Sequence, residues 1–317
     1  MRSEFDFIHN LKSKYSLSRV GDDCAVLSKD AKYDLLLTTD MLIEDIDFRL
    51  AWITPELLGH KALAVSLSDI AAMGGKPVWS MLSIGVPETL WQSDFIDRFY
   101  EGWFTLARNH GVELIGGDVS RSEAKLVVDS IVGGEVAKGK AILRSTANIG
   151  DAIFVSGTLG GAAGGLKLLE NGARCGQKHN ELLILKQLQP QPQLSIAKLL
   201  YQLDIATSMI DISDGLSSDL AHLCEQSMVG ANVKAERIPV NQNLLEKFPA
   251  DECLRLALDG GEDFELLFTA DREHILKLES IGVTHIGETT AHSGVMEIKI
   301  DKVNHPLTPN GFSHFDQ

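Results

Sequence analysis

The sequence has few cysteines, and none of the four stands in a pair. Cys24, Cys175, Cys224 and Cys253 are scattered, without the CxxC spacing of a zinc or redox site. This spacing predicts free thiols in a reduced compartment, so we expect the protein to be cytoplasmic. The first fifteen residues carry charges throughout and no apolar block, which argues against a secretory signal.

Long hydrophobic runs and basic residues are also scarce. No stretch of about 18 uncharged apolar residues occurs, so no membrane-spanning helix is predicted. The chain has 29 Lys and Arg against 44 Asp and Glu, a formal net charge of −15. Such a surface repels nucleic acids and anionic lipids, which argues against a nucleic-acid or membrane partner.

The familiar nucleotide-binding motifs are absent as well. The sequence has no GxxxxGK[ST] loop, no GxGxxG after its first strand and no paired HRD and DFG motifs. The glycine-rich stretch GTLGGAAGG, residues 157–165, is more typical of close backbone packing at a strand-to-helix turn than of a phosphate loop.

The 317 residues, 44% of them hydrophobic, suffice for two domains of ordinary size. Strand-like and helix-like segments alternate along the chain, which predicts a mixed α/β fold. A polar, glycine-containing turn around residue 148 precedes a fresh strand. We therefore predict two domains, residues 1–148 and residues 149–317.

Local signals predict several elements. A helix should begin after Thr54, which can cap it, with Pro55 in its first turn and Gly74 near its end. Two further helices are expected over residues 88–110 and 251–258. Strands are expected in the apolar segments 33–39, 112–115, 125–132 and 152–156, and in the segment EDFELLFTA.

Acidic residues recur at the ends of predicted elements or beside glycine, in the motifs GDD, TTD, SD, GGD, DISD and GGED. A single acid of this kind is usually a turn former or a helix cap. Asp69 is different, because its helix is apolar on nearly every side and a buried charge needs a cation, a metal or backbone donors. Asp40, at the end of its apolar strand, poses the same question.

Many oxygen ligands without matching His or Cys spacing suit a hard cation such as Mg²⁺. Mg²⁺ also lets an acidic protein bind an anionic nucleotide, so the pattern suggests phosphate chemistry. A structural ion pair at Asp69 stays open as the alternative.

Taken in order, these segments resemble the thiamine-monophosphate kinases, of the superfamily that includes aminoimidazole ribonucleotide synthetase. The matching motifs span essentially the whole chain: GDDCAVL, TTDMLIEDIDF, KALAVSLSDIAAMGGKPVW, LIGGDVSRS, DISDGLSSDL, GGEDFELLFT and GFSHF. The resemblance implies an N-terminal α/β domain that binds ATP and Mg²⁺ and forms a homodimer through its sheet. It also implies a C-terminal α+β domain that completes the active site.

The activity implied is direct in-line transfer of the γ-phosphoryl group of ATP to thiamine monophosphate, giving thiamine diphosphate and ADP, with several Mg²⁺ ions. The catalytic residues would be Asp40, Asp69 and Asp118. The Mg²⁺ ligands would be Asp23, Thr38, Thr39, Asp40, Asp69, Asp118, Asp211 and Asp214. Nucleotide contacts would come from Gly117, Asp118, Arg144 and Ser213. Substrate contacts would come from Asp47, Glu262 and Phe312.

Two positions depart from the family pattern. Asp47 lies where these kinases usually have a histidine, and an ionised acid cannot donate a hydrogen bond to a substrate phosphate. Phe312 lies where other members often have tryptophan or tyrosine, a change that keeps the aromatic face and loses the polar group.

Other functions stay open. A Mg²⁺-dependent phosphohydrolase would release phosphate without an acceptor. Another ATP-using member of the superfamily, similar to aminoimidazole ribonucleotide synthetase, would act on an amidine sugar phosphate. A nucleotide sensor would bind Mg·ATP and turn over nothing. The GGED and GFSHF motifs favour thiamine.

Overall fold

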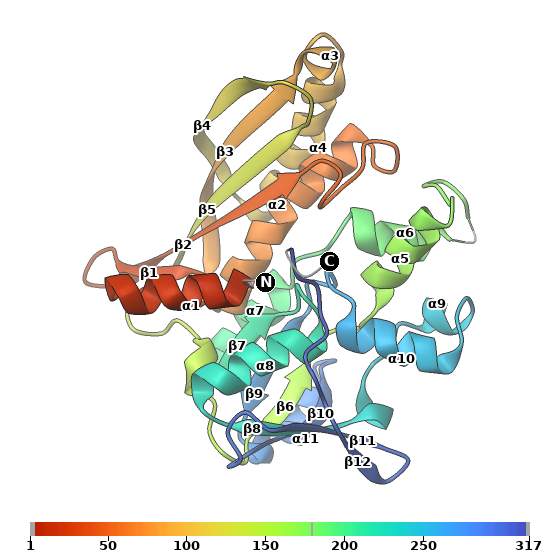
Figure 1. Cartoon of the computed structure of the whole chain (residues 1–317). Coiled ribbons are helices and arrows are strands. Elements are labelled where there is room, and N and C mark those ends of the chain that lie inside the picture. The colour runs from red at the N-terminus through yellow and green to blue at the C-terminus, as the bar shows by residue number, and fades with distance from the viewer. Residues whose placement is uncertain (1–3, 179, 315–317) are drawn as a thin grey trace.

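The structure, a computed structural model, describes residues 4–178 and 180–314. It contains two β-sheets with helices packed against them (Figure 1). This arrangement confirms the predicted mixed α/β class. The strands of the first sheet come from residues 25–137 and those of the second from residues 152–306. The domain boundary after residue 148 stays a prediction, and it falls between the two sheets.

The five-stranded first sheet has the order β1-β2-β5-β3-β4. This half of the chain contains α1 (Glu4–Tyr15), β1 (Ala25–Ser28), β2 (Tyr33–Ile43), α2 (Pro55–Ala72), β3 (Lys76–Pro87), α3 (Glu88–Trp91), α4 (Phe95–His110), β4 (Glu113–Ser122), β5 (Val127–Ala137) and the 3-10 turn η1 (Arg144–Thr146).

The seven-stranded second sheet has the order β12-β11-β8-β10-β6-β9-β7. Its strands are β6 (Ala152–Val155), β7 (Ala206–Asp211), β8 (Gly230–Lys234), β9 (Leu266–Ala270), β10 (Thr284–Thr290), β11 (Met296–Ile300) and β12 (Val303–Pro306). The helical segments around it are α5 (Gly161–Glu170), α6 (Glu181–Leu188), α7 (Leu194–Leu203), α8 (Leu216–Ser227), η2 (Ala235–Arg237), α9 (Gln242–Leu245), α10 (Ala250–Asp259), η3 (Arg272–His274) and α11 (Ile275–Glu279).

The central element is α2, which the sequence predicted correctly. The Thr54 hydroxyl accepts a hydrogen bond from the Leu57 amide at 3.4 Å, Pro55 occupies the first turn, and Gly74 follows the helix with a φ of +68°. Almost every residue of α2 is buried. It packs on β2 and β5 of the first sheet and on β7 of the second, so one hydrophobic core joins both halves of the protein.

Along one side, α2 also lies against α4. A Cβ on Gly59 would lie 1.9 Å from the Phe99 carbonyl oxygen, so only glycine allows the two helices to approach this closely. Both helices cover the same face of the first sheet (Figure 1).

Several predicted boundaries are wrong. The helix expected over 88–110 is two helices, α3 and α4, because the chain turns at residues 92–94. Strand β2 continues to Ile43, which places Asp40 inside the strand rather than at its end. The GGD motif is not a turn: Gly117 and Asp118 lie inside β4, paired with Leu82 and Ser83 of β3. Among the described residues no helix has the length and apolar character needed to cross a membrane.

The structure confirms the close backbone packing predicted for the glycine-rich stretch, residues 157–165. A Cβ on Gly165 would lie 2.1 Å from the Leu183 carbonyl oxygen, so α5 and α6 touch through their backbones. The buried Asp263 carboxylate accepts hydrogen bonds from the amides of Gly160 at 2.5 Å and Ala162 at 3.1 Å. Two amides at the start of α5 are therefore already satisfied by a carboxylate of the protein itself.

Candidate active site

A cluster of carboxylates lies where α2 meets both sheets. Asp69 is near the end of α2, Asp211 is the last residue of β7 and Asp23 precedes β1. Carboxylate oxygens of these three residues all lie within 4.8 Å of one another. Asp23 and Asp211 are buried, and Asp69 keeps some exposed surface. We call Asp23, Asp69 and Asp211 the acidic cluster.

Serine and threonine hydroxyls orient the carboxylates in and beside this cluster. On α2, Ser66 donates to Asp40 Oδ2 at 2.7 Å and Ser68 donates to Asp211 Oδ2 at 2.6 Å. Thr38 of β2 donates to Asp69 Oδ2. Because Thr38 and Asp40 are two residues apart on a strand, both face α2. Ser66 and Ser68, buried polar residues in an otherwise apolar helix, were not among the predicted site residues.

The carboxylates repel one another strongly. Desolvation, together with the neighbouring charge of Asp23, raises the pKa of Asp211 to about 8. Desolvation likewise raises the pKa of Asp40 to about 6 and holds the pKa of Asp69 well above its usual range, where Asp40 and Asp211 add to the effect. The three crowded ligands of the acidic cluster are all carboxylates, a set that fits a hard divalent cation.

One arginine already faces the cluster. Arg144, in η1, donates from Nε to Asp23 Oδ2 at 3.2 Å and from Nη2 to Asp23 Oδ1, while its backbone amide donates to Asp22 at 2.8 Å. Burial alone would lower the pKa of Arg144, but the charge of Asp23 and the hydrogen bonds to it raise the pKa overall. Arg144 therefore stays charged at the edge of the cluster, where a phosphate could meet it.

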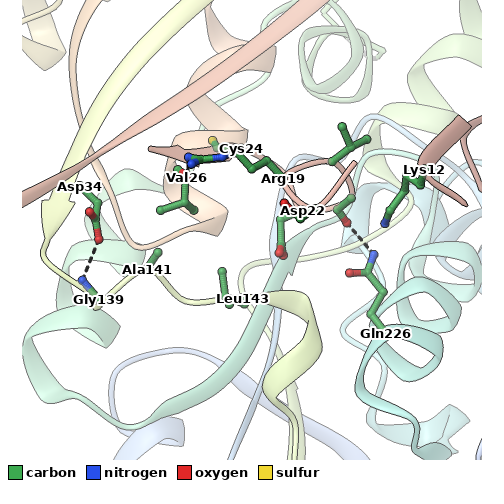
Figure 2. Close-up of a pocket in the computed structure, with 13 residues that line it drawn as sticks. Lys12, Arg19, Asp22, Cys24, Val26, Asp34, Gly139, Ala141, Leu143 and Gln226 are labelled. Carbon is green, nitrogen blue, oxygen red and sulfur yellow. Dashed lines mark hydrogen bonds between the residues drawn. The ribbon is translucent and has the colours of Figure 1, made fainter. Parts of the chain in front are cut away.

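A cavity of about 400 Å³ adjoins this edge. Figure 2 shows Lys12, Arg19 and Asp22 among the residues that line it, and Gln226, which donates to the Gly21 carbonyl at 2.6 Å. A space of this volume suits a small-molecule ligand. Neither Lys12 nor Arg19 was predicted as a site residue, because both lie in a segment without a motif.

The residues predicted to contact the substrate lie near one another. Glu262 follows Gly261 with a φ of +66°, and its amide donates to the Ser213 carbonyl at 2.7 Å. Desolvation raises the pKa of Asp47, and the negative charge of Glu262 raises it further. The Phe312 amide donates to the Asp214 carbonyl at 3.0 Å, which ties the C-terminal segment to the DISD loop. The last residue of the GFSHF motif lies outside the described residues.

A lysine that the sequence analysis missed joins this group. Lys61 of α2 is only 1% exposed and its Nζ lies 2.6 Å from Glu262 Oε1. The signal was available, because a lysine within the apolar segment HKALAVSL needs a buried partner just as Asp69 does.

The structure does not bring every predicted residue to the acidic cluster. Thr39 points to the opposite face of the sheet from Thr38 and donates to Asp129 Oδ1 at 2.7 Å. Asp118 lies on the edge strand β4, three strand spacings from β2 and thus about 14 Å from Asp40 in the same sheet. The main chain of Asp214 lies beside the cluster, where its amide donates to the buried Asp219 carboxylate at 3.2 Å.

Comparison with known proteins agrees with this geometry. The family models for the N-terminal and C-terminal domains of AIR synthase related proteins match residues 21–136 and 148–299. The thiamine-monophosphate kinase of Buchnera aphidicola subsp. Acyrthosiphon pisum is 37% identical over 312 residues, 96% of this chain and 94% of the relative. The thiamine-monophosphate kinase of Bacillus subtilis is 35% identical over 328 residues, 98% of this chain and 99% of the relative.

A solved structure, AaThiL complexed with AMPPCP and TMP, shares the fold with a TM-score of 0.89 and 34% identity. It covers 99% of this chain, and 97% of that chain is matched. Relatives of this identity over nearly the full length fix the family. The chain therefore belongs to the thiamine-monophosphate kinase family of AIR synthase related proteins.

Proposed function

We propose that this chain phosphorylates thiamine monophosphate to thiamine diphosphate, using ATP and releasing ADP. The observation that carries the proposal is the acidic cluster, with Arg144 at its edge, in a chain of this family. The related AaThiL complex, which contains AMPPCP and TMP, supports both the nucleotide and the acceptor.

The residues that would hold Mg²⁺ are Asp23, Asp69 and Asp211, with Thr38, Asp40 and Asp214 close by. Bound Mg²⁺ ions would neutralise the phosphates of both substrates and so allow two anions to approach each other. The hydroxyls of Ser66, Ser68 and Thr38 hold the carboxylates in place beforehand, which lowers the cost of reorganisation. Metal-binding roles for Thr39 and Asp118 stay proposals that rest on the resemblance.

Other side chains would position the two substrates for the transfer. Arg144 would offer two parallel N–H groups to a phosphate, and Ser213 and Gly117 would contact the nucleotide. The acceptor phosphate is itself an anionic nucleophile, so direct in-line transfer needs no protein base. At the other end, Glu262 would face the positively charged thiazolium ring, and Phe312 would offer it an aromatic face.

The proposal is tested by a coupled ADP assay with Mg·ATP, run with and without thiamine monophosphate. We expect ADP release to require the acceptor and thiamine diphosphate to appear by chromatography. ADP release without acceptor would instead establish a phosphohydrolase or an enzyme with another acceptor. Tight binding of Mg·ATP without turnover would establish a nucleotide sensor.

We also propose that the chain forms a homodimer through its first sheet. The face turned away from α2 exposes Met41 and Met81, which are 56% and 37% exposed, and Ile115 and Val119 of β4 are exposed as well. Exposed apolar side chains on one sheet suit a partner surface. Sedimentation should give a dimer, and Met41→Glu should weaken it. A cytoplasmic location is likewise our proposal, supported by four free thiols in the described chain.

Asp47→His is expected to leave kcat unchanged and to keep or improve the apparent affinity for thiamine monophosphate. A histidine can donate a hydrogen bond to a phosphate, whereas the ionised Asp47 only accepts one, at present from the Ile43 amide at 2.7 Å. Steady-state KM values for both substrates provide the check. A large loss of activity would show that Asp47 has a role of its own in this chain.

A further inference from the structure

Lys61 is the most deeply buried charged side chain of α2. It is 1% exposed and lies within the core that joins the two sheets, and its Nζ contacts Glu262 Oε1 at 2.6 Å and the Gln187 carbonyl at 3.4 Å. A lysine costs several kcal/mol of desolvation at such a place unless a carboxylate compensates for it. The pair therefore depends on Glu262, which comes from the other half of the chain.

Glu262 is held from three directions. Its amide donates to the Ser213 carbonyl, Lys61 faces one carboxylate oxygen, and Gln187 Nε2 of α6 donates to the other. Its side chain nevertheless keeps 28% of its surface exposed, so a ligand can reach it. The carboxylate is thus both fixed and accessible, unlike that of Asp263 one residue later, which is buried against backbone amides.

The same helix carries both ends of the site. Lys61 and Asp69 are eight residues apart on α2, which corresponds to about 12 Å along the helix axis. Asp69 lies in the acidic cluster, and Lys61 meets the carboxylate proposed to face the thiazolium ring. Because α2 is rigid and buried on nearly all sides, it fixes the spacing between these two groups.

We propose that Lys61 is a positioning residue that holds the Glu262 carboxylate, at a set distance from the acidic cluster, for a ligand with a phosphate at one end and a cationic ring at the other. This inference rests on the proposed function and deepens it. Lys61 acts through Glu262 and not by touching the substrate itself. Removal of the lysine should therefore affect the cationic substrate and leave the nucleotide unaffected.

The test is a double-mutant cycle with Lys61→Met, Glu262→Gln and the double variant. For Lys61→Met we expect the KM for thiamine monophosphate to rise about tenfold or more, while the KM for ATP stays within about twofold. In the Glu262→Gln background, Lys61→Met should add no further change. Lys140→Met, which breaks the exposed ion pair with Asp204 at 3.0 Å, is the matched control and should leave both KM values unchanged.

Equal KM values for thiamine monophosphate in the wild type and Lys61→Met would overturn the inference. The inference would also be overturned if Lys61→Met raised the KM for thiamine monophosphate as much in the Glu262→Gln background as in the wild type. Lys61 would then act by a route that does not involve Glu262. Each single variant leaves one charge of the Lys61–Glu262 pair without its partner, so both are first checked by thermal unfolding. If either does not fold, the double variant, which contains neither charge, is compared with the wild type. An unchanged KM for thiamine monophosphate in the double variant would overturn the inference. A wild-type protein that makes no thiamine diphosphate would contradict the proposed function itself, which separates the two failures.

Discussion

Asp69→Asn is expected to lower kcat by about a thousandfold while the protein stays folded. Asp69 Oδ2 accepts a hydrogen bond from Thr38, and its carboxylate lies among those of Asp23 and Asp211. An asparagine has nearly the same shape but lacks the charge that a divalent cation requires. Turnover at saturating Mg·ATP and thiamine monophosphate, together with a thermal unfolding curve, measures both parts of the expectation.

The matched control for this variant is Asp204→Asn, because the Asp204 side chain is exposed and forms an ion pair with Lys140 at the protein surface. It should retain wild-type turnover. The turnover of Asp40→Asn should fall as that of Asp69→Asn does, because Ser66 fixes Asp40 at the same end of α2. Near wild-type activity in both Asp69→Asn and Asp40→Asn would refute a metal site at the acidic cluster.

The stability of the folded protein should depend strongly on pH. Burial raises the folded-state pKa of Asp211 to about 8, against an ordinary value of 3.8. Between these values the folded protein binds the proton more tightly than the unfolded chain, so stability falls as pH rises from about 4 to about 8. Asp40, with a pKa of about 6, contributes in the lower part of this range.

We therefore expect the Tm of the metal-free protein to fall between about pH 5 and pH 8, and Mg²⁺ to raise it more at the higher pH. Asp211→Asn should raise the Tm of the metal-free protein near pH 8 and remove most of the Mg²⁺ effect. Calorimetry with and without chelator provides the measurement. A Tm that is independent of both pH and Mg²⁺ would show that the cluster is not strained by its charges.

Elements with local signals could be predicted from the sequence. The helix α2 follows from Thr54, Pro55 and the glycines after it, since capping and φ preferences act over a few residues. The extent of β4 could not be predicted in the same way. Its pairing with β3 converts the GGD motif from a turn into strand, and pairing depends on residues far apart in the chain.

In the candidate site, too, local signals could be read from the sequence, whereas contacts between distant residues could not. Asp69 was recognisable because a charge in an apolar helix needs a partner, and Lys61 could have been recognised by the same argument. That Asp69 meets Asp23 and Asp211, whereas Lys61 meets Glu262, depends on how the two sheets enclose α2. The distance of Asp118 from the cluster depends on strand order, which no local pattern contains.

In the proposed mechanism, the acidic cluster holds Mg²⁺ for transfer of a phosphoryl group to thiamine monophosphate. The most direct test follows γ-labelled ATP with thiamine monophosphate over a range of Mg²⁺ concentrations. We predict that label enters thiamine diphosphate in a one-to-one ratio with ADP, and only when Mg²⁺ is present. Label recovered in inorganic phosphate would contradict transfer to thiamine monophosphate, and thiamine diphosphate formed in excess chelator would contradict the role of Mg²⁺.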